Sequence, residues 1–219
     1  MDSHHAWTDI GIKAHLEQYF NIPILLENDN NLAAIGEMHL GHDEQLEDLI
    51  YVSCGTGLGS GIIINGQIYK GFNRAAGEMG TMMGSDGKRI EDAVGIDGLL
   101  KRIEQALAIE GRNLKFSQIV EMAKGGNLQV NKVIREIGKE IGRVAYNASL
   151  LLDIQTIVIG GDYLKLGQAF FDGIEDAVPQ NPHFRPRVIG STLKESAGIF
   201  GSFVLGKNEI LNRKLMTVK

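Results

Sequence analysis

Apolar residues follow two patterns along the chain. The first, short strand-like apolar runs, predicts strands. Between Asp48 and Gly71, apolar runs flank a glycine-rich turn, and Asn65–Gly66 is the dipeptide typical of a two-residue hairpin. We therefore expect three antiparallel strands in this stretch. Near the C-terminus "TIVIGG" and "RVIG" read as strands on either side of a helix from about 164 to 178, a βαβ unit, with a last helix at 195–205.

The second pattern, a spacing of three to four residues, predicts helices elsewhere. The first helix should stop at Asn21–Pro23, followed by a short strand "ILLE" (24–27) and a helix closing at Gly41, a residue suited to a left-handed cap. Further helices are expected at 92–109, 116–124 and 129–152. The buried stripe of the last is predicted to be Val130, Ile134, Ile137, Ile141, Val144, Ala148 and Leu151.

Composition changes this picture little. The 219 residues, 43% of them hydrophobic, suffice for one sizeable core, and no repeat or polar linker divides them, so we expect one α/β domain over 1–219. A net charge of −5 without a basic run argues against nucleic-acid binding through this chain.

The cysteine count and the hydropathy pattern restrict the compartment and the kinds of site that the chain can have. The single cysteine, Cys54, excludes an intrachain disulfide and a cysteine-based zinc site, which fits a cytoplasmic location. No apolar run approaches the roughly 18 to 20 residues of a membrane helix, and no secretion signal opens the chain.

Two motifs sit where ligands commonly bind. Asn28 and Asp29 fall at the junction of the expected strand and helix, where an aspartate could act as a general base, although capping of the helix explains these residues at least as well. In "CGTGLGSG" (54–61) the glycines could turn backbone N–H groups toward a phosphate, but a glycine-rich turn without ligand is common, and the P-loop lysine is absent.

Two further motifs are weaker. Glu78, in a glycine-flanked loop, and Glu91, at a helix start, could accept hydrogen bonds from sugar hydroxyls; a solvated loop acid and a first-turn helix acid are the ordinary alternatives. Gly160 and Gly161 follow a buried strand, where backbone could pack on a nucleotide or simply turn.

The order of these motifs resembles the ROK family, which comprises repressors, open reading frames and sugar kinases. The shared pattern is "ND" before a helix with "AAIGE", then "GTGLGSG", Gly71, "AAGEMG" and a late "IVIGG", and it extends from about 10 to 205. The resemblance implies an actin-like, ribonuclease-H-like ATPase fold with a mixed sheet flanked by helices.

The resemblance also implies roles for matching residues. Asp29 would be the catalytic base, and sugar hydroxyls would be bound by Asn28, Asp29, Glu78 and Glu91. ATP phosphates would face the backbone of Gly55, Thr56, Gly57 and Gly59, and the adenosine would lie beside Gly160 and Gly161.

Two departures from the family are visible. Thr81 stands where the family has a histidine that contacts sugar and zinc, and the cysteine-rich zinc loop is missing, so we expect no metal site. The family's Asp-x-Gly-x-Thr loop is also absent, and we read the chain as the C-terminal half of a ROK protein, lacking an N-terminal half with that loop or a helix-turn-helix. Without the loop, this chain alone should not catalyse phosphoryl transfer.

Two functions remain open at this stage. The chain is interpreted as the sugar-binding and dimerisation domain of a sugar-responsive transcriptional regulator, or alternatively as the C-terminal half of an ATP-dependent hexose kinase. The implied partners are a small sugar or sugar derivative and a second copy in a homodimer, with ATP and Mg²⁺ only in a full-length protein.

Overall fold

The protein, seen in a computed structural model, is described over residues 11–42, 44, 46–84, 87–109, 111, 113–179 and 183–216. It is built on a five-stranded mixed sheet with the order β3-β2-β1-β4-β5. The strands are β1 (Leu49–Cys54), β2 (Leu58–Ile64), β3 (Gln67–Ile68), β4 (Thr156–Gly160) and β5 (Arg187–Gly190).

The predicted antiparallel run and βαβ unit are both confirmed. β1 pairs antiparallel with β2, β2 with β3, and β4 pairs parallel with both β1 and β5. Asn65 and Gly66 both have positive φ, 53° and 71°, as the two-residue turn requires.

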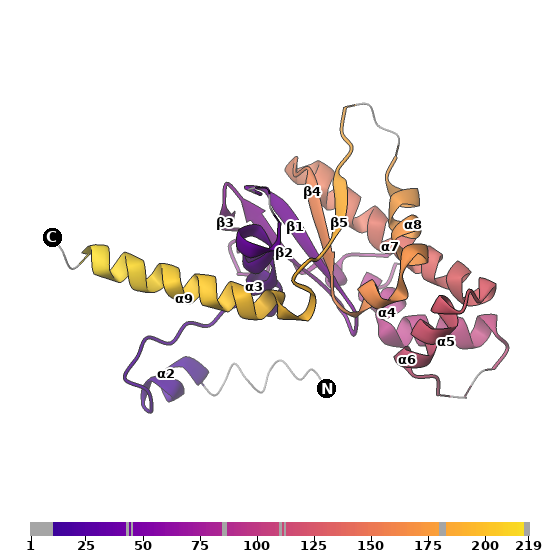
Figure 1. Ribbon diagram of the computed structural model, residues 1–219, viewed down its shortest axis with the longest axis horizontal. Helices are drawn as coiled ribbons and strands as arrows, with labels where there is room; N and C mark the ends of the chain where they lie inside the picture. Colours follow the sequence, from indigo (N-terminus) through magenta and orange to yellow (C-terminus); the bar gives the residue numbers. More distant parts are fainter. Residues whose placement is uncertain are drawn as a thin grey trace.

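Successive residues of the central strands face opposite layers, because side chains alternate along a strand. Ile50 and Val52 of β1 face one layer, formed by α5 (Ile96–Ala106), α6 (Phe116–Lys124), α7 (Leu128–Leu152) and α8 (Gln168–Ala177). Leu49 and Tyr51 face the other layer, formed by α3 (Asp29–Gly36), the π-helix η1 (Glu37–Gly41) and α9 (Ala197–Met216). Figure 1 shows the sheet between these groups, with α9 running beyond it.

Glycines allow α3 and α9 to cross closely. A Cβ on Gly201 would overlap the carbonyl oxygen of Leu32, and one on Gly36 would overlap that of Ala197. The crossing fixes α3, which begins at Asp29 and is capped by Asn28.

Several sequence predictions about the helices are wrong. The helix expected at 92–109 is two helices, α4 (Ile90–Val94) and α5, because the chain turns at Gly95 so that the Ile96 N–H can bond the Gly55 carbonyl, 2.9 Å away. The helix expected at 164–178 is a 3₁₀ turn, η3 (Asp162–Leu166), followed by α8, with Gly167 at φ 77° between them. α9 continues well past Leu205.

Two predictions about single residues also fail. Leu151 is 85% exposed, and Leu152, one residue further along α7, packs against the core instead. Gly41 does not have a left-handed conformation; a Cβ there would overlap the Glu37 carboxylate, which accounts for the glycine.

The strand expected at 24–27 does not form. After the short helix α2 (Ile12–Glu17), which buries none of its residues, the chain is extended but bonded to no strand in the described part of the molecule. Leu25 and Leu26 remain exposed, at 40% and 51%, because nothing described covers them.

Within the described ranges, no helix has the length and apolar content that crossing a membrane would require.

Candidate functional site

A hollow of about 430 Å³ opens where β1 and β4 end and α3 begins. It brings together nine of the ten residues predicted from the sequence, and the exception is Gly160. The hollow, called the cleft below, is lined by Asn28, Asp29, Asn30, Ser53, Cys54, Gly55, Thr56, Gly57, Leu58, Gly59, Glu78, Glu91, Gly161 and Asp162.

Asn28 caps α3, and Asp29 is the residue that follows the cap. The Asn28 side-chain oxygen caps α3 by accepting from the backbone N–H groups of Asn30 and Asn31, at 2.9 and 3.2 Å. Asp29 is the first residue of the helix, and one of its carboxylate oxygens accepts from the Asn30 N–H at 2.9 Å. The cap leaves the Asn28 amide NH₂ and the second Asp29 oxygen available to a ligand in the cleft.

Glu27, directly before the cap, holds the start of α3 in place through its carboxylate. Its carboxylate accepts from the Asn31 side chain at 2.9 Å and from the Asn28 N–H at 3.0 Å, and it forms an ion pair with Lys70. Burial alone would raise the pKa of Glu27, but the hydrogen bond from Lys70 and those from Asn31 and Asn28 outweigh it and lower the pKa.

The glycine turn between β1 and β2 is closed by a hydrogen bond from the Gly55 N–H to the Gly57 carbonyl, at 3.1 Å. A Cβ on Gly55 or Gly57 would meet its nearest described neighbours at ordinary contact distance, 3.5 and 3.4 Å. Packing therefore does not demand glycine at these two positions, and their backbone is open to the cleft. On Gly59, by contrast, a Cβ would overlap the Asn30 amide.

Glu78 is brought to the cleft by its attachment to β2. The Ser60 side chain and backbone N–H both donate to the carbonyl of Gly77, directly before Glu78. The Thr81 hydroxyl donates to the Glu78 carbonyl at 2.7 Å, so Thr81 braces this loop and is not among the residues that line the cleft.

Glu91 reaches the cleft from α4. One carboxylate oxygen pairs with Arg89 at 3.2 Å, and the other lies against Gly80, where a Cβ would come within 2.7 Å of it. Glu91 is thus both a first-turn helix acid and a lining residue.

Gly160 and Gly161 have different surroundings, and only Gly161 lines the cleft. Gly160 lies against the Tyr51 ring, so its lack of a side chain has a packing cause. Gly161 lines the cleft with φ 85°, and a Cβ there would overlap the Cys54 carbonyl.

Sequence reasoning missed five lining residues, of which Asp162 is the most informative. It directly follows the glycine pair at the end of β4 and pairs with Lys165 at 2.7 Å. The strand-end rule that selected Asp29 would also have selected Asp162. Cys54 lines the cleft but is buried, and burial raises the pKa of its thiol, which favours the neutral form over the thiolate.

Metal ligands are not gathered here. In the described part of the chain, no three His, Cys, Asp or Glu side chains stand close enough to hold a metal ion. The expectation that zinc is absent remains a prediction for metal analysis of the protein.

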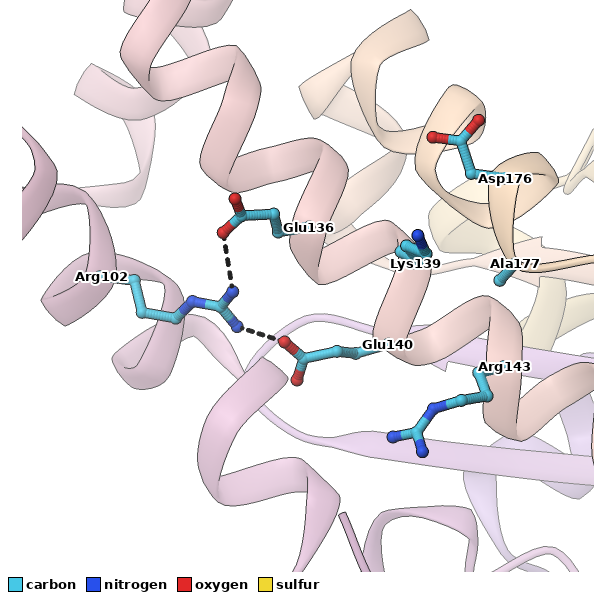
Figure 2. A pocket seen from close by; sticks show the side chains of 7 residues that line it. All are labelled: Arg102, Glu136, Lys139, Glu140, Arg143, Asp176 and Ala177. Atoms are coloured by element: carbon cyan, nitrogen blue, oxygen red, sulfur yellow. Dashed lines mark hydrogen bonds and ion pairs between the residues drawn. The ribbon is translucent and has the colours of Figure 1, made fainter. Parts of the chain in front are cut away.

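A second hollow, of about 400 Å³, lies on the outer side of α7. Figure 2 shows Arg102 of α5 between Glu136 and Glu140, at 3.3 and 2.8 Å. Glu136 and Glu140 are therefore paired with a cation already in place, and Asp176, the third acid of this hollow, pairs with Arg135 at 2.6 Å. The cleft remains the candidate ligand site because it gathers nine of the ten residues predicted from the sequence.

Comparison with known proteins identifies the family of the chain. A model of the ROK family matches residues 2–209. A glucokinase from Halalkalibacterium halodurans is 28% identical over 235 residues, covering 93% of this chain and 69% of that protein. A xylose repressor from Caldicellulosiruptor bescii is 25% identical over 230 residues, covering 94% of this chain and 57% of that one.

A solved structure agrees in fold. A ROK family glucokinase from Streptomyces griseus, in complex with glucose and AMPPNP, superposes with a TM-score of 0.75 at 26% identity, over 88% of this chain and 71% of that one. The mixed sheet flanked by helices is thus the actin-like ATPase fold of sugar kinases. The chain belongs to the ROK family.

Proposed function

We propose that this chain is the sugar-binding domain of a ROK-type transcriptional regulator that responds to a sugar. The observation that carries the proposal is the convergence of Asn28, Asp29, Glu78 and Glu91 on one cleft. Carboxylates and amides are the acceptors and donors that bind neighbouring sugar hydroxyls.

A hexose kinase is the alternative, and the position of Asp29 favours it. The carboxylate stands at the start of α3, on the same cleft as the open glycine turn, where a base could take a proton from a hydroxyl facing a phosphate donor. In such a kinase, the backbone of Gly55 and Gly57 would face the phosphates of ATP. The charge of Mg²⁺ would offset that of the phosphates.

The charges of the cleft favour sugar binding over phosphoryl transfer by this chain alone. No Lys, Arg or His is among the described residues that line it, whereas phosphoryl transfer relies on cations around the transferred group. Binding a sugar without transferring phosphate needs no such clamp.

We also propose that a second lobe completes the molecule, since the chain spans 57% of the repressor and 69% of the glucokinase. It would cover the apolar side chains that the segment after α2 and α9 leave exposed, together called the apolar strip. The exposed side chains of this apolar strip are Tyr19, Phe20, Ile22, Leu25, Leu26, Ile199, Phe200, Phe203, Ile210 and Leu211. The second lobe would carry the DNA-binding part of a regulator or the missing phosphate loop of a kinase.

The remaining expectations stay proposals. The protein would act in the cytoplasm, and pairing into a homodimer through α7 would use the outer face of that helix, because its inner face is buried in the core. Sedimentation at several concentrations tests the dimer.

Calorimetry of the chain against hexoses, N-acetylhexosamines and pentoses tests the sugar-binding function. We expect one sugar to bind at one site per chain, without ATP turnover. ATP-dependent phosphorylation of that sugar by the longer protein would favour the kinase instead. No binding by any of the three classes would refute a sugar site.

A further inference from the structure

Two walls of the cleft come from separate segments of the chain. The helix wall is formed by Asn28 and Asp29 at the start of α3, and the loop wall by Glu78 in the loop 69–78 after β3. A sugar that bridges these walls needs them at a fixed separation, because hydrogen bonds form only over a narrow range of distances. The contacts that hold this separation therefore belong to the site.

Each wall is packed on β2. A Cβ on Gly61 of β2 would overlap the carbonyl oxygen of Asn30, so strand and helix are in close contact beside the helix wall. Ser60, the preceding residue of β2, holds the Gly77 carbonyl through its hydroxyl and its backbone N–H, directly before Glu78. The strand thus supports the two walls separately.

Lys70 connects one wall to the other. Its ammonium nitrogen lies 2.5 Å from a carboxylate oxygen of Glu27, the residue directly before the helix wall. Its backbone carbonyl accepts from the Ala76 N–H at 3.1 Å, two residues before Glu78. A single residue therefore contacts the segments that carry both walls.

The turn after Lys70 is shaped for the second of these contacts. Gly71 has φ 70°, and a Cβ there would stand only 3.3 Å from the Cβ of Ala76. A side chain is disfavoured at this position by the backbone conformation and by the close neighbour. Glycine thus lets the loop fold back until the Lys70 carbonyl reaches Ala76.

The ion pair has a constrained geometry. The Glu27 side chain is 8% exposed and the Lys70 side chain 35%. The second Glu27 oxygen accepts from the Asn31 side chain and the Asn28 N–H, so both carboxylate oxygens have partners and the group cannot turn freely. Neither Glu27 nor Lys70 is among the described residues that line the cleft, so any effect of the pair on a ligand acts through position.

We propose that Glu27 and Lys70 are a positioning pair for the cleft, whose contact sets the separation of the helix wall and the loop wall and thereby the affinity for a bridging sugar. This inference rests on the proposed sugar-binding function. It adds to the site two residues that do not touch the ligand.

The first test is calorimetry of the chain with glucose, mannose, galactose, N-acetylglucosamine, N-acetylmannosamine and xylose, repeated on variants with the sugar that binds. Glu27→Gln keeps the side-chain size and an oxygen for Asn31 and Asn28, but it removes the charge that holds Lys70. We expect this variant to bind the sugar on the order of tenfold more weakly. Lys70→Arg keeps a cation opposite Glu27 and should retain most of the affinity.

A double variant and a control separate positioning from a general loss of structure. If the pair acts as one unit, Glu27→Gln combined with Lys70→Met should bind no more weakly than Glu27→Gln alone. Lys124→Met breaks an exposed ion pair with Glu121 on α6, away from the residues that line the cleft, and should leave the affinity unchanged.

A second readout needs no sugar. In the free ¹⁵N-labelled chain, Glu27→Gln should shift the amide signals of Ala76 and Glu78, because the loop wall loses its connection to the helix wall. Lys124→Met should leave both signals in place. Urea unfolding at neutral pH checks that every variant is folded.

The outcomes separate the two proposals. Unchanged sugar affinity in Glu27→Gln overturns the positioning role and leaves the sugar site standing. A further tenfold loss in the double variant, or amide signals of Ala76 and Glu78 that do not move, likewise overturns it. Failure of the wild type to bind any of the six sugars refutes the sugar-binding function and the positioning role together.

Discussion

The Ser60 hydroxyl donates a hydrogen bond of 2.8 Å to the carbonyl oxygen of Gly77, and the Ser60 backbone N–H donates to the same oxygen at 2.9 Å. This double contact ties the loop that carries Glu78 to β2. Gly77 has φ 89°, and a Cβ on it would overlap the Ser60 carbonyl. The position of a proposed ligand-binding carboxylate thus depends on a glycine beside a strand.

Gly77→Ala should destabilise the protein and displace Glu78. We expect a loss of at least about 2 kcal/mol in the free energy of unfolding, since the change adds a steric clash to an unfavourable φ. Gly66→Ala is the matched control: its φ is 71° but a Cβ meets nothing within 4 Å, so its loss should be about 1 kcal/mol. Equal losses in urea unfolding would mean that Gly77 is not held against Ser60.

The crossing of α3 and α9 gives a second prediction. Gly201→Ala should lower the free energy of unfolding by about 2 kcal/mol or more, because the new methyl group would push the helices apart. Gly206→Ala, in the same helix with nothing within 4 Å, should raise it by up to about 1 kcal/mol, since alanine is the better helix former. Thermal unfolding that ranks the two variants the other way would refute the close crossing.

Glu27 predicts how the start of α3 responds to acid. Because its pKa is lowered in the folded state, its ionised form adds stability that is fully present above the ordinary glutamate pKa and is lost as the pH falls through the folded value. Urea unfolding from pH 7 down into the acid range should therefore show a steeper loss of stability in the wild type than in Glu27→Gln. Parallel curves would show that the contacts with Lys70 and Asn31 do not favour the charged form.

The apolar strip predicts different responses from adjacent residues of α9. Phe203 is 66% exposed and Val204 only 7%, so Phe203→Ser should leave the melting temperature of the chain nearly unchanged while Val204→Ser lowers it. If a second lobe covers the strip in the longer protein, Phe203→Ser should destabilise that protein. A melting temperature insensitive to Phe203→Ser in both forms would argue against the covered strip.

Local patterns predicted β1, β2 and β3 well because these strands are consecutive and the turns between them are short. The Asn65–Gly66 hairpin and the alternation of β1 and β2 require only neighbouring residues. The motif glycines and acids converge on one cleft because strand ends in such a sheet lie at one edge.

What sequence reasoning missed depends on distant partners. The buried Glu37 accepts hydrogen bonds from the Ser191 hydroxyl at 2.5 Å and the Leu193 N–H at 3.1 Å, over 150 residues away, and no local pattern indicates this contact. The segment 24–27 has the composition of a strand, but a strand also needs a neighbour, and the described part of the chain offers it none.

The most direct test of the sugar cleft is NMR chemical-shift mapping of the ¹⁵N-labelled chain during titration with the sugar that calorimetry selects. We predict saturable shifts of the amides of Asn30, Gly57 and Glu78, and none at Lys139 or Glu140, which line the second hollow beside α7. Shifts confined to the second hollow, or no shift at Gly57 and Glu78 at saturating sugar, would contradict the assignment of the cleft.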